Sequence, residues 1–91
     1  MTDQLIPEVD STVRLHGLIA GVWGDLLGVP AVRDTDSFFG LGGHSLQALH
    51  MLDLVEDSCG AELGGMREIS EHPTLAEFVT FVAGRLATGP G

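Results

Sequence analysis

Apolar residues recur at helical spacing in three parts of the chain, and the first of these parts begins near Val13. Its apolar positions follow the i, i+3, i+4, i+7 rule of an amphipathic helix and are Leu15, Leu18, Ile19, Val22, Trp23, Leu26 and Leu27. Ser11 or Thr12 is the expected N-cap, and Gly28 ends the pattern. We expect Trp23 to anchor the core, because several glycines weaken this helix and make it depend on packing.

The other two helical parts begin at Ser45 and just after Thr74. The apolar positions of the second part are Leu46, Ala48, Leu49, Met51, Leu52 and Val55. Gly60 ends this helix, and residues 64–70 favour one short helical turn. The sequence Thr74-Leu-Ala-Glu77 is a capping box, which predicts the start of the last helix.

Residues 28–44 separate the first two helices and show no sustained period. A loop of this length in so small a domain is usually functional. Phe38, Phe39 and Leu41 are expected to hold the loop against the core. The sequence contains neither strand alternation nor an internal repeat. It therefore predicts an all-α fold, a small four-helix bundle with a long loop between helices 1 and 2 and a short helix 3.

The chain is long enough for one small domain, since it has 91 residues of which 44% are hydrophobic. We expect this domain over residues 12–86, with a flexible lead-in over residues 1–11 and a flexible tail over residues 87–91. Acidic residues outnumber basic ones by 13 to 4, which gives a formal net charge of −9. Such a surface repels nucleic acid and anionic lipid and favours a protein partner with a basic face.

Cys59 is the single cysteine of the sequence, so an internal disulfide is excluded and a reducing compartment is expected. The N-terminal sequence lacks the pattern of a signal peptide, and no apolar stretch is long enough to span a bilayer. We therefore expect a monomer in the cytoplasm, with neither a membrane nor a nucleic acid as its partner.

The run Asp36-Ser-Phe-Phe-Gly-Leu-Gly-Gly-His-Ser-Leu46 carries the strongest chemical signal. Its Ser45 opens the second helix, so the hydroxyl is expected at a helix N-terminus, where free backbone N–H groups and the dipole favour a phosphate. The structural alternative is that Ser45 is an ordinary N-cap. Because no neighbouring residue would by itself make the hydroxyl a nucleophile, the run indicates a site where a group is attached.

Catalytic and metal-binding chemistries fit the sequence poorly. A nucleophile elbow needs a second glycine where Gln47 stands, and the adjacent His44 is badly placed as a general base. A nucleotide-binding P-loop needs a lysine, which the sequence lacks. A calcium loop starting at Asp34 would have Phe39 in place of its glycine and Ser45 in place of its glutamate. The histidines and the cysteine lack the spacing of zinc ligands, so we expect neither a catalytic nor a metal site.

A family resemblance follows from the same run of residues. It is carried by Phe38, Phe39, Leu41, Gly42, Gly43, His44, Ser45 and Leu46, and then by residues 60–63, 66–69 and 72–75. From about Val13 to Leu86 the chain resembles the carrier-protein (thiolation) domains of nonribosomal peptide synthesis, relatives of the acyl carrier proteins. The resemblance implies a bundle of the acyl-carrier type, without catalytic activity. It also implies that Ser45 holds 4'-phosphopantetheine, which a separate phosphopantetheinyl transferase moves from coenzyme A, and that the thiol of this arm carries a thioester.

A histidine directly before the serine, here His44, resembles the peptidyl carriers. Fatty-acid and polyketide carriers more often have aspartate at this position. The resemblance therefore favours an aminoacyl or peptidyl cargo, loaded by an adenylating enzyme and passed to condensation or tailoring enzymes. The second helix departs from this pattern, because it has Asp53, Glu56 and Asp57 and no lysine or arginine. A carrier of polyketide or fatty acyl groups thus stays an alternative. Another is a helical protein-interaction module in which Ser45 is only a cap.

Gly43, His44, Leu46 and Leu49 are the candidate partner-binding residues. Leu46 and its neighbours along the helix resemble the surface that the family offers to partner enzymes, while core packing is the alternative for both leucines. The two glycines before His44 are expected to let the backbone turn tightly and to leave space around Ser45. The start at Met1 and the short tail suggest a free-standing carrier.

Overall fold

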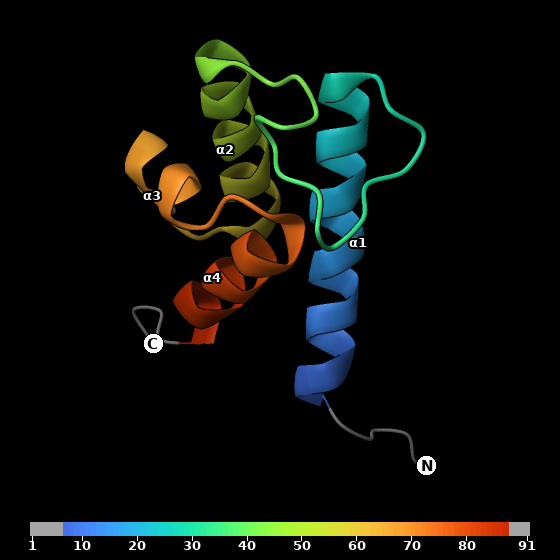
Figure 1. Ribbon diagram of the computed structural model, residues 1–91. Helices are drawn as coiled ribbons and strands as arrows, with labels where there is room; N and C mark the ends of the chain where they lie inside the picture. The colour runs from blue at the N-terminus through green and yellow to red at the C-terminus, as the bar shows by residue number, and fades with distance from the viewer. Residues whose placement is uncertain (1–6, 88–91) are drawn as a thin grey trace.

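A computed structural model describes residues 7–87, with side chains from residue 12 onward, and contains four helices in that range (Figure 1). The helices are α1 (Pro7–Leu27), α2 (Ser45–Cys59), α3 (Met66–Glu71) and α4 (Leu75–Ala87). Residues 7–87 form no strand; their one β-type pairing is an isolated bridge between Ser37 and Thr74. The predicted all-α four-helix fold is confirmed.

Helix α1 begins at Pro7, earlier than the predicted cap at Ser11 or Thr12. Residues 7–11, which we expected in the lead-in, are therefore helical. Proline is well tolerated at the first helical position, because the N–H that it lacks would have no partner within the helix there. The rest of the predicted lead-in and residues 88–91 of the predicted tail lie outside the described residues.

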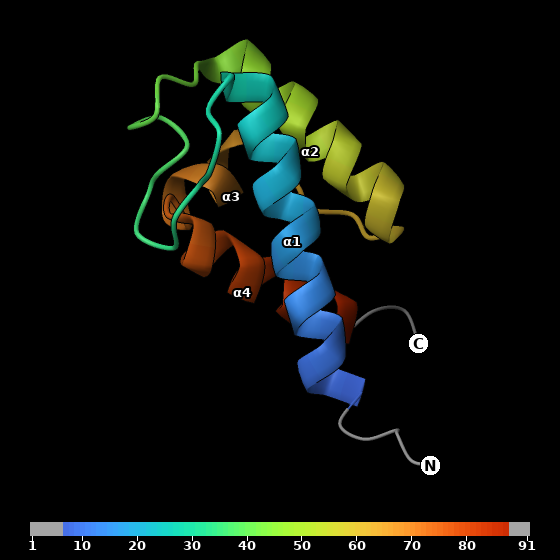
Figure 2. The ribbon, with the colours of Figure 1, turned by 90° about the vertical axis from the view of Figure 1, so that its right-hand side faces the viewer.

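The longest helix, α1, stands beside α2 and α4, and the end of α1 and the start of α2 lie at the same end of the molecule (Figures 1 and 2). Trp23 of α1 is fully buried between two phenylalanines. Its ring centroid lies 5.3 Å from Phe38, edge-on, and 5.9 Å from Phe78. Trp23 is thus the core anchor that the sequence predicts. The other buried apolar residues are Leu15, Ile19, Ala48, Met51, Leu52, Val55, Leu63, Ile69, Leu75, Val79 and Val82.

Backbone hydrogen bonds fasten the loop of residues 28–44 to the start of α4. The N–H of Phe38 donates to the Pro73 carbonyl at 3.2 Å, and the N–H of Leu75 donates to the Asp36 carbonyl at 2.9 Å. Phe38 is the aromatic residue that holds the loop in the core. Phe39, expected to do the same, is 36% exposed and packs edge-on against the Phe38 ring.

The buried face of α2 consists of Ala48, Met51, Leu52 and Val55. Leu46 and Leu49, by contrast, are 74% and 43% exposed. The core-packing interpretation is therefore wrong for both leucines. The reason is geometric, because positions 48, 51, 52 and 55 share one side of a helix and leave positions 46 and 49 on another.

The predicted capping box at the start of α4 is confirmed. The Glu77 N–H donates to Thr74 Oγ1 at 3.2 Å, and the Thr74 N–H donates to Glu77 Oε1 at 3.2 Å. Gly60 ends α2 in the left-handed conformation, with φ 77°, and its N–H donates to the Glu56 carbonyl at 2.7 Å. Over the described residues, none of the helices has the length and apolar character needed to cross a bilayer.

Candidate functional site

Ser45 is the first residue of α2 and is exposed. Among the side chains from residue 12 to residue 87, none forms a hydrogen bond with its hydroxyl. The N-cap position belongs to His44, whose backbone is extended with φ −126° and ψ 175°. The interpretation of Ser45 as an ordinary N-cap is therefore wrong. A hydroxyl that does no capping is free to form a bond with an incoming group.

His44 and Gln47 form a capping box at the start of α2. The Gln47 N–H donates to His44 Nδ1 at 3.4 Å, and the His44 N–H donates to Gln47 Oε1 at 3.2 Å. The His44 ring is therefore turned toward the backbone of α2, and it acts as an acceptor rather than as a base for Ser45. This box was not predicted, because histidine is not among the usual N-cap residues. Its one signal in the sequence was a glutamine three positions after His44.

The other end of the Gln47 side chain reaches α1. Its Nε2 donates a hydrogen bond of 3.1 Å to the Leu26 carbonyl, in the last turn of that helix. Carbonyls in the last turn of a helix have no partner within the helix, so Gln47 satisfies one of them. Nothing in the sequence pairs Gln47 with a residue 21 positions earlier, and this contact was not predicted.

Gly42 and Gly43 shape the backbone that leads to Ser45. Gly42 has φ 103°, a conformation that residues with a side chain rarely adopt, so the predicted tight turn is present. Gly43 is needed for a different reason, because the Phe38 ring lies so close that a Cβ placed on residue 43 would be 2.4 Å from Phe38 Cε2. Its N–H donates to the Phe38 carbonyl at 3.0 Å. Both glycines thus fix the path of the chain between the core and Ser45.

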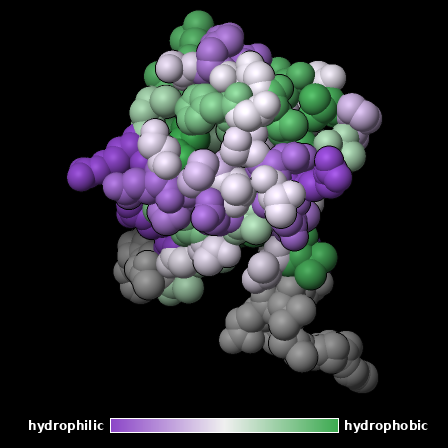
Figure 3. Space-filling view, viewed as in Figure 1, coloured by the Kyte–Doolittle hydropathy of each residue, from purple (hydrophilic) through white to green (hydrophobic). Residues whose placement is uncertain are grey.

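Three of the four candidate partner-binding residues gather around one shallow hollow beside the start of α2. His44, Leu46 and Leu49 line it with Gln47, His50 and Asp53, whereas Gly43 does not. In the view of Figure 3, hydrophobic residues lie among hydrophilic ones at the end of the molecule where α1 ends and α2 begins, whereas hydrophilic residues cover α3. Leu46, the residue after Ser45, and Leu49 are the exposed apolar residues of this hollow.

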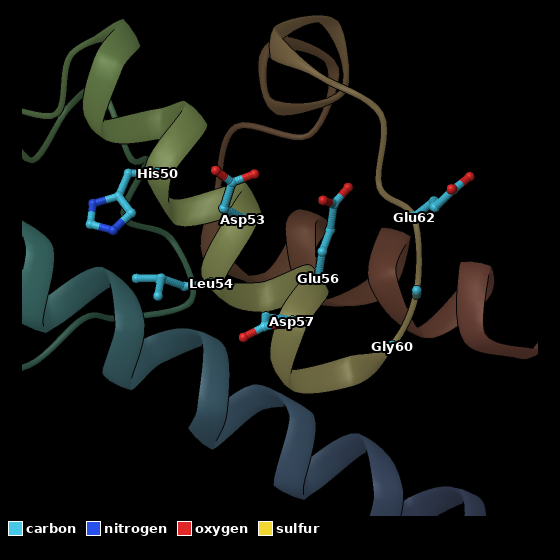
Figure 4. A pocket seen from close by; sticks show the side chains of 8 residues that line it. His50, Asp53, Leu54, Glu56, Asp57, Gly60 and Glu62 are labelled. Carbon is cyan, nitrogen blue, oxygen red and sulfur yellow. The ribbon is translucent and has the colours of Figure 1, made fainter.

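The C-terminal half of α2 is acidic. Asp53, Glu56, Asp57 and Glu62 surround a second shallow hollow together with His50 and Leu54 (Figure 4). Glu56 also has a structural role, since its Oε2 accepts a 2.7 Å hydrogen bond from the N–H of Leu63. The first turn of α2 contains no acidic residue. The negative charge thus begins beyond the turn where a phosphate on Ser45 would lie.

Metal ligands do not come together in the part of the chain that the structure describes: it contains no group of three histidine, cysteine, aspartate or glutamate side chains able to hold an ion. Cys59 is partly buried, and this burial raises the pKa of its thiol.

Comparison with known proteins shows the family to which most of the chain is similar. Residues 17–82 match the family model described as "Phosphopantetheine attachment site". Among curated proteins, the malpinin synthetase of Mortierella alpina is 39% identical over 75 residues, which is 82% of this chain. The tyrocidine synthase 2 of Brevibacillus parabrevis is 33% identical over 76 residues, or 84% of this chain. The chain spans only 1% to 2% of the length of these curated relatives.

The similar solved structures are also carrier proteins. One similar structure is BlmI, a type-II acyl-carrier-protein from Streptomyces verticillus involved in bleomycin biosynthesis. It is 31% identical with a TM-score of 0.80, and the match covers 88% of this chain and 95% of that one. Another is PCP, a prototype for the peptidyl carrier domains of modular peptide synthetases, at 30% identity and a TM-score of 0.67, with 76% and 90% of the two chains covered.

Proposed function

Because the chain belongs to the family of proteins with a phosphopantetheine attachment site, we propose that Ser45 is the residue that carries 4'-phosphopantetheine. The family binds this cofactor covalently, and the chain is a carrier, a non-catalytic tether rather than an enzyme. The observation that supports Ser45 is its exposed hydroxyl at the first position of α2, without a hydrogen bond to any of the described side chains.

The start of α2 fits a phosphodiester. Free backbone N–H groups and the positive end of the helix dipole face this position, and they stabilise a nearby negative charge by about 0.3–1 kcal/mol. Because the first turn has no carboxylate, nothing there opposes the added charge. Attachment forms a bond between Ser45 Oγ and phosphorus and breaks the bond from that phosphorus to the adenosine bisphosphate part of coenzyme A. The hydroxyl proton passes to a base of the transferase, since the imidazole of His44 is occupied by the Gln47 N–H.

An aminoacyl or peptidyl group, held as a thioester on the arm, is the cargo we favour. His44 before the serine supports it, as does the similarity to a peptidyl carrier structure. A polyketide or fatty acyl cargo is the second candidate, because the acidic second half of α2 and the similarity to an acyl-carrier-protein favour it. The alternative of a helical interaction module assumed that Ser45 is only a helix cap. His44 and not Ser45 caps α2, so this assumption is wrong.

The partners that follow from this role are a phosphopantetheinyl transferase, an adenylating enzyme and downstream condensation or tailoring enzymes. Tethering would raise the effective concentration of the cargo at each of them. The exposed Leu46 and Leu49, with His44, are the proposed contact surface beside Ser45, and Gly43 would support it by fixing the backbone. A free-standing protein is supported by the near full-length match to a type-II carrier.

Attachment at Ser45 is tested by incubating the protein with coenzyme A and a promiscuous phosphopantetheinyl transferase and recording the intact mass. We expect the mass of one phosphopantetheine to be gained by the native chain and by Ser58→Ala, a control at another exposed serine of α2. Ser45→Ala should gain nothing. A gain that survives Ser45→Ala would refute the assignment of the residue.

The cargo is tested on the modified protein. Amino-acid-activating enzymes and acyl-loading enzymes are each offered their substrates, and the bound group is identified by mass. Aminoacyl loading supports the proposal, whereas loading only from malonyl or fatty acyl donors would assign the chain to the acyl carriers.

A further inference from the structure

We propose that Gln47 is a positioning residue for the modification of Ser45, because its side chain fixes the start of α2 against the end of α1. The inference rests on the proposed attachment at Ser45. It concerns a residue whose side chain forms no hydrogen bond with the Ser45 hydroxyl and acts through His44 and Leu26.

The oxygen and the nitrogen of the Gln47 side-chain amide bond to the start of α2 and to the end of α1, respectively. Gln47 Oε1 accepts the His44 N–H at 3.2 Å, and Gln47 Nε2 donates to the Leu26 carbonyl at 3.1 Å. The first bond fixes the peptide directly before His44, one residue away from Ser45. The second joins that peptide to α1, whose Trp23 lies in the core. Ser45 is thereby placed relative to the whole bundle and not only to its own helix.

Only a side chain with both a donor and an acceptor at this reach can make the two bonds together. A carboxylate offers acceptors alone, and an ammonium group offers donors alone. The assignment of amide oxygen and nitrogen follows from the partners, since the oxygen meets an N–H and the nitrogen meets a carbonyl. Positions 45 and 47 are about 200° apart around a helix, so Ser45 points outward while Gln47 is partly buried.

A second hydrogen bond holds the preceding peptide, between Gly42 and Gly43. The Gly43 N–H donates to the Phe38 carbonyl at 3.0 Å, so consecutive amides at positions 43 and 44 are tied to different parts of the molecule. Loss of the Gln47 amide would remove the bond to the His44 N–H and the link to α1, and would leave the Gly43 bond to Phe38 and the long bond from the Gln47 N–H to His44 Nδ1. The Ser45 hydroxyl would then sample other directions, in the free protein and on the transferase alike.

The first test compares Gln47→Met with Thr80→Val in transfer from coenzyme A, with kcat and KM measured separately. Gln47→Met keeps the length of the side chain and removes both bonds, while Thr80→Val removes one side-chain hydrogen bond, to the Ala76 carbonyl, on α4. We expect Gln47→Met to lower kcat at saturating carrier on the order of 5- to 10-fold, because a misplaced reacting group loses rate within the complex. The KM for coenzyme A should not change, and Thr80→Val should transfer at the native rate.

The second test separates positioning from stability. In Gln47→Lys the ammonium group can still donate to the Leu26 carbonyl, where a cation also suits the C-terminal end of α1. It cannot accept from the His44 N–H. We expect a Tm equal to or above the native value, a lowered kcat, and faster hydrogen exchange of the His44 amide. A variant that is stable but slow excludes a merely structural role for Gln47.

The outcomes distinguish this inference from the proposed attachment site. If the native chain is not modified, the attachment at Ser45 fails. If the native chain is modified and both Gln47 variants reach the native kcat, the positioning role fails alone. A rise in the KM for the carrier without a change in kcat would make Gln47 a partner contact and would also overturn the positioning role.

Discussion

The backbone of Gly43 lies against the ring of Phe38 so closely that a Cβ at position 43 would be 2.4 Å from Cε2 and 2.9 Å from the Phe38 carbonyl oxygen. The backbone that leads to Ser45 therefore packs directly on the fully buried Phe38 ring. A contact of this kind restricts position 43 to glycine, whatever partner later binds there.

Gly43→Ala should destabilise the fold by about 1–3 kcal/mol, because the added methyl group forces the ring or the backbone to move. Gly21→Ala is the matched control, since its Cβ would meet nothing within 4 Å and the position is helical. That change should stabilise the protein by about 0.5–1 kcal/mol. Urea unfolding measures both, and equal effects of the two substitutions would contradict the close contact.

Substitution of the adjacent residues Phe38 and Phe39 by alanine should cause very different losses of stability. Phe38→Ala removes a fully buried ring from contact with Trp23 and should cost about 3–5 kcal/mol. Phe39→Ala should cost far less, because Phe39 is 36% exposed. Thermal or chemical unfolding of the two variants is the measurement. Comparable losses would mean that Phe39 holds the loop as well, as the sequence alone suggested.

Replacement of His44 by a better cap should stabilise α2. His44 accepts the Gln47 N–H at a long 3.4 Å, whereas asparagine is among the preferred N-cap residues. We expect His44→Asn to raise the free energy of unfolding by about 0.5 kcal/mol and His44→Ala to lower it by a similar amount. If both variants unfold like the native chain, the His44 ring does not cap the helix.

Glu68 should contribute a pH-dependent part of the stability. Its carboxylate accepts the Gly65 N–H at 2.8 Å, and this bond is the main cause that lowers the pKa of Glu68. A lowered pKa in the folded state means that the contribution is present above the ordinary glutamate pKa of about 4.3 and is lost as the pH falls through the lowered value. We therefore expect Glu68→Gln to lose stability at neutral pH and to show a shallower loss in acid.

The control for this effect is Glu71→Gln, whose exposed carboxylate pairs with Arg67 at 3.4 Å. Exposed ion pairs of this kind contribute little, so this variant should follow the native acid unfolding curve. A nuclear magnetic resonance titration of the Glu68 carboxyl gives the direction of its pKa directly. An unshifted or raised value would contradict the hydrogen bond from the Gly65 N–H to the Glu68 carboxylate.

Helix periodicity and local caps could be predicted from the sequence because they depend on residues close together in the chain. The Thr74 and Glu77 box and the burial of Trp23 are of this kind. The face of α2 that turns inward was not predictable in the same way. Apolar residues surround much of this helix, so its period alone does not decide whether Leu49 or Met51 is buried.

Within the candidate site, the position of Ser45 at the start of α2 followed from the motif and its glycines. The contact of Gln47 with Leu26 did not, because it depends on how α1 and α2 meet in three dimensions. The start of α1 was missed for another reason, since proline, which breaks a helix in its interior, also suits the first turn, where Pro7 lies.

The hydrogen bonds of Phe38 with Pro73 and of Leu75 with Asp36 make the loop and the first turn of α4 a single cooperative unit. The Ala76 N–H also donates to the Asp34 carbonyl at 3.1 Å, so opening of either segment breaks bonds that the other segment shares. The amides of Phe38 and Leu75 should accordingly exchange with solvent through the same opening event and with similar protection. A substitution that weakens the beginning of the last helix should therefore also reduce the order of the loop segment that leads to Ser45.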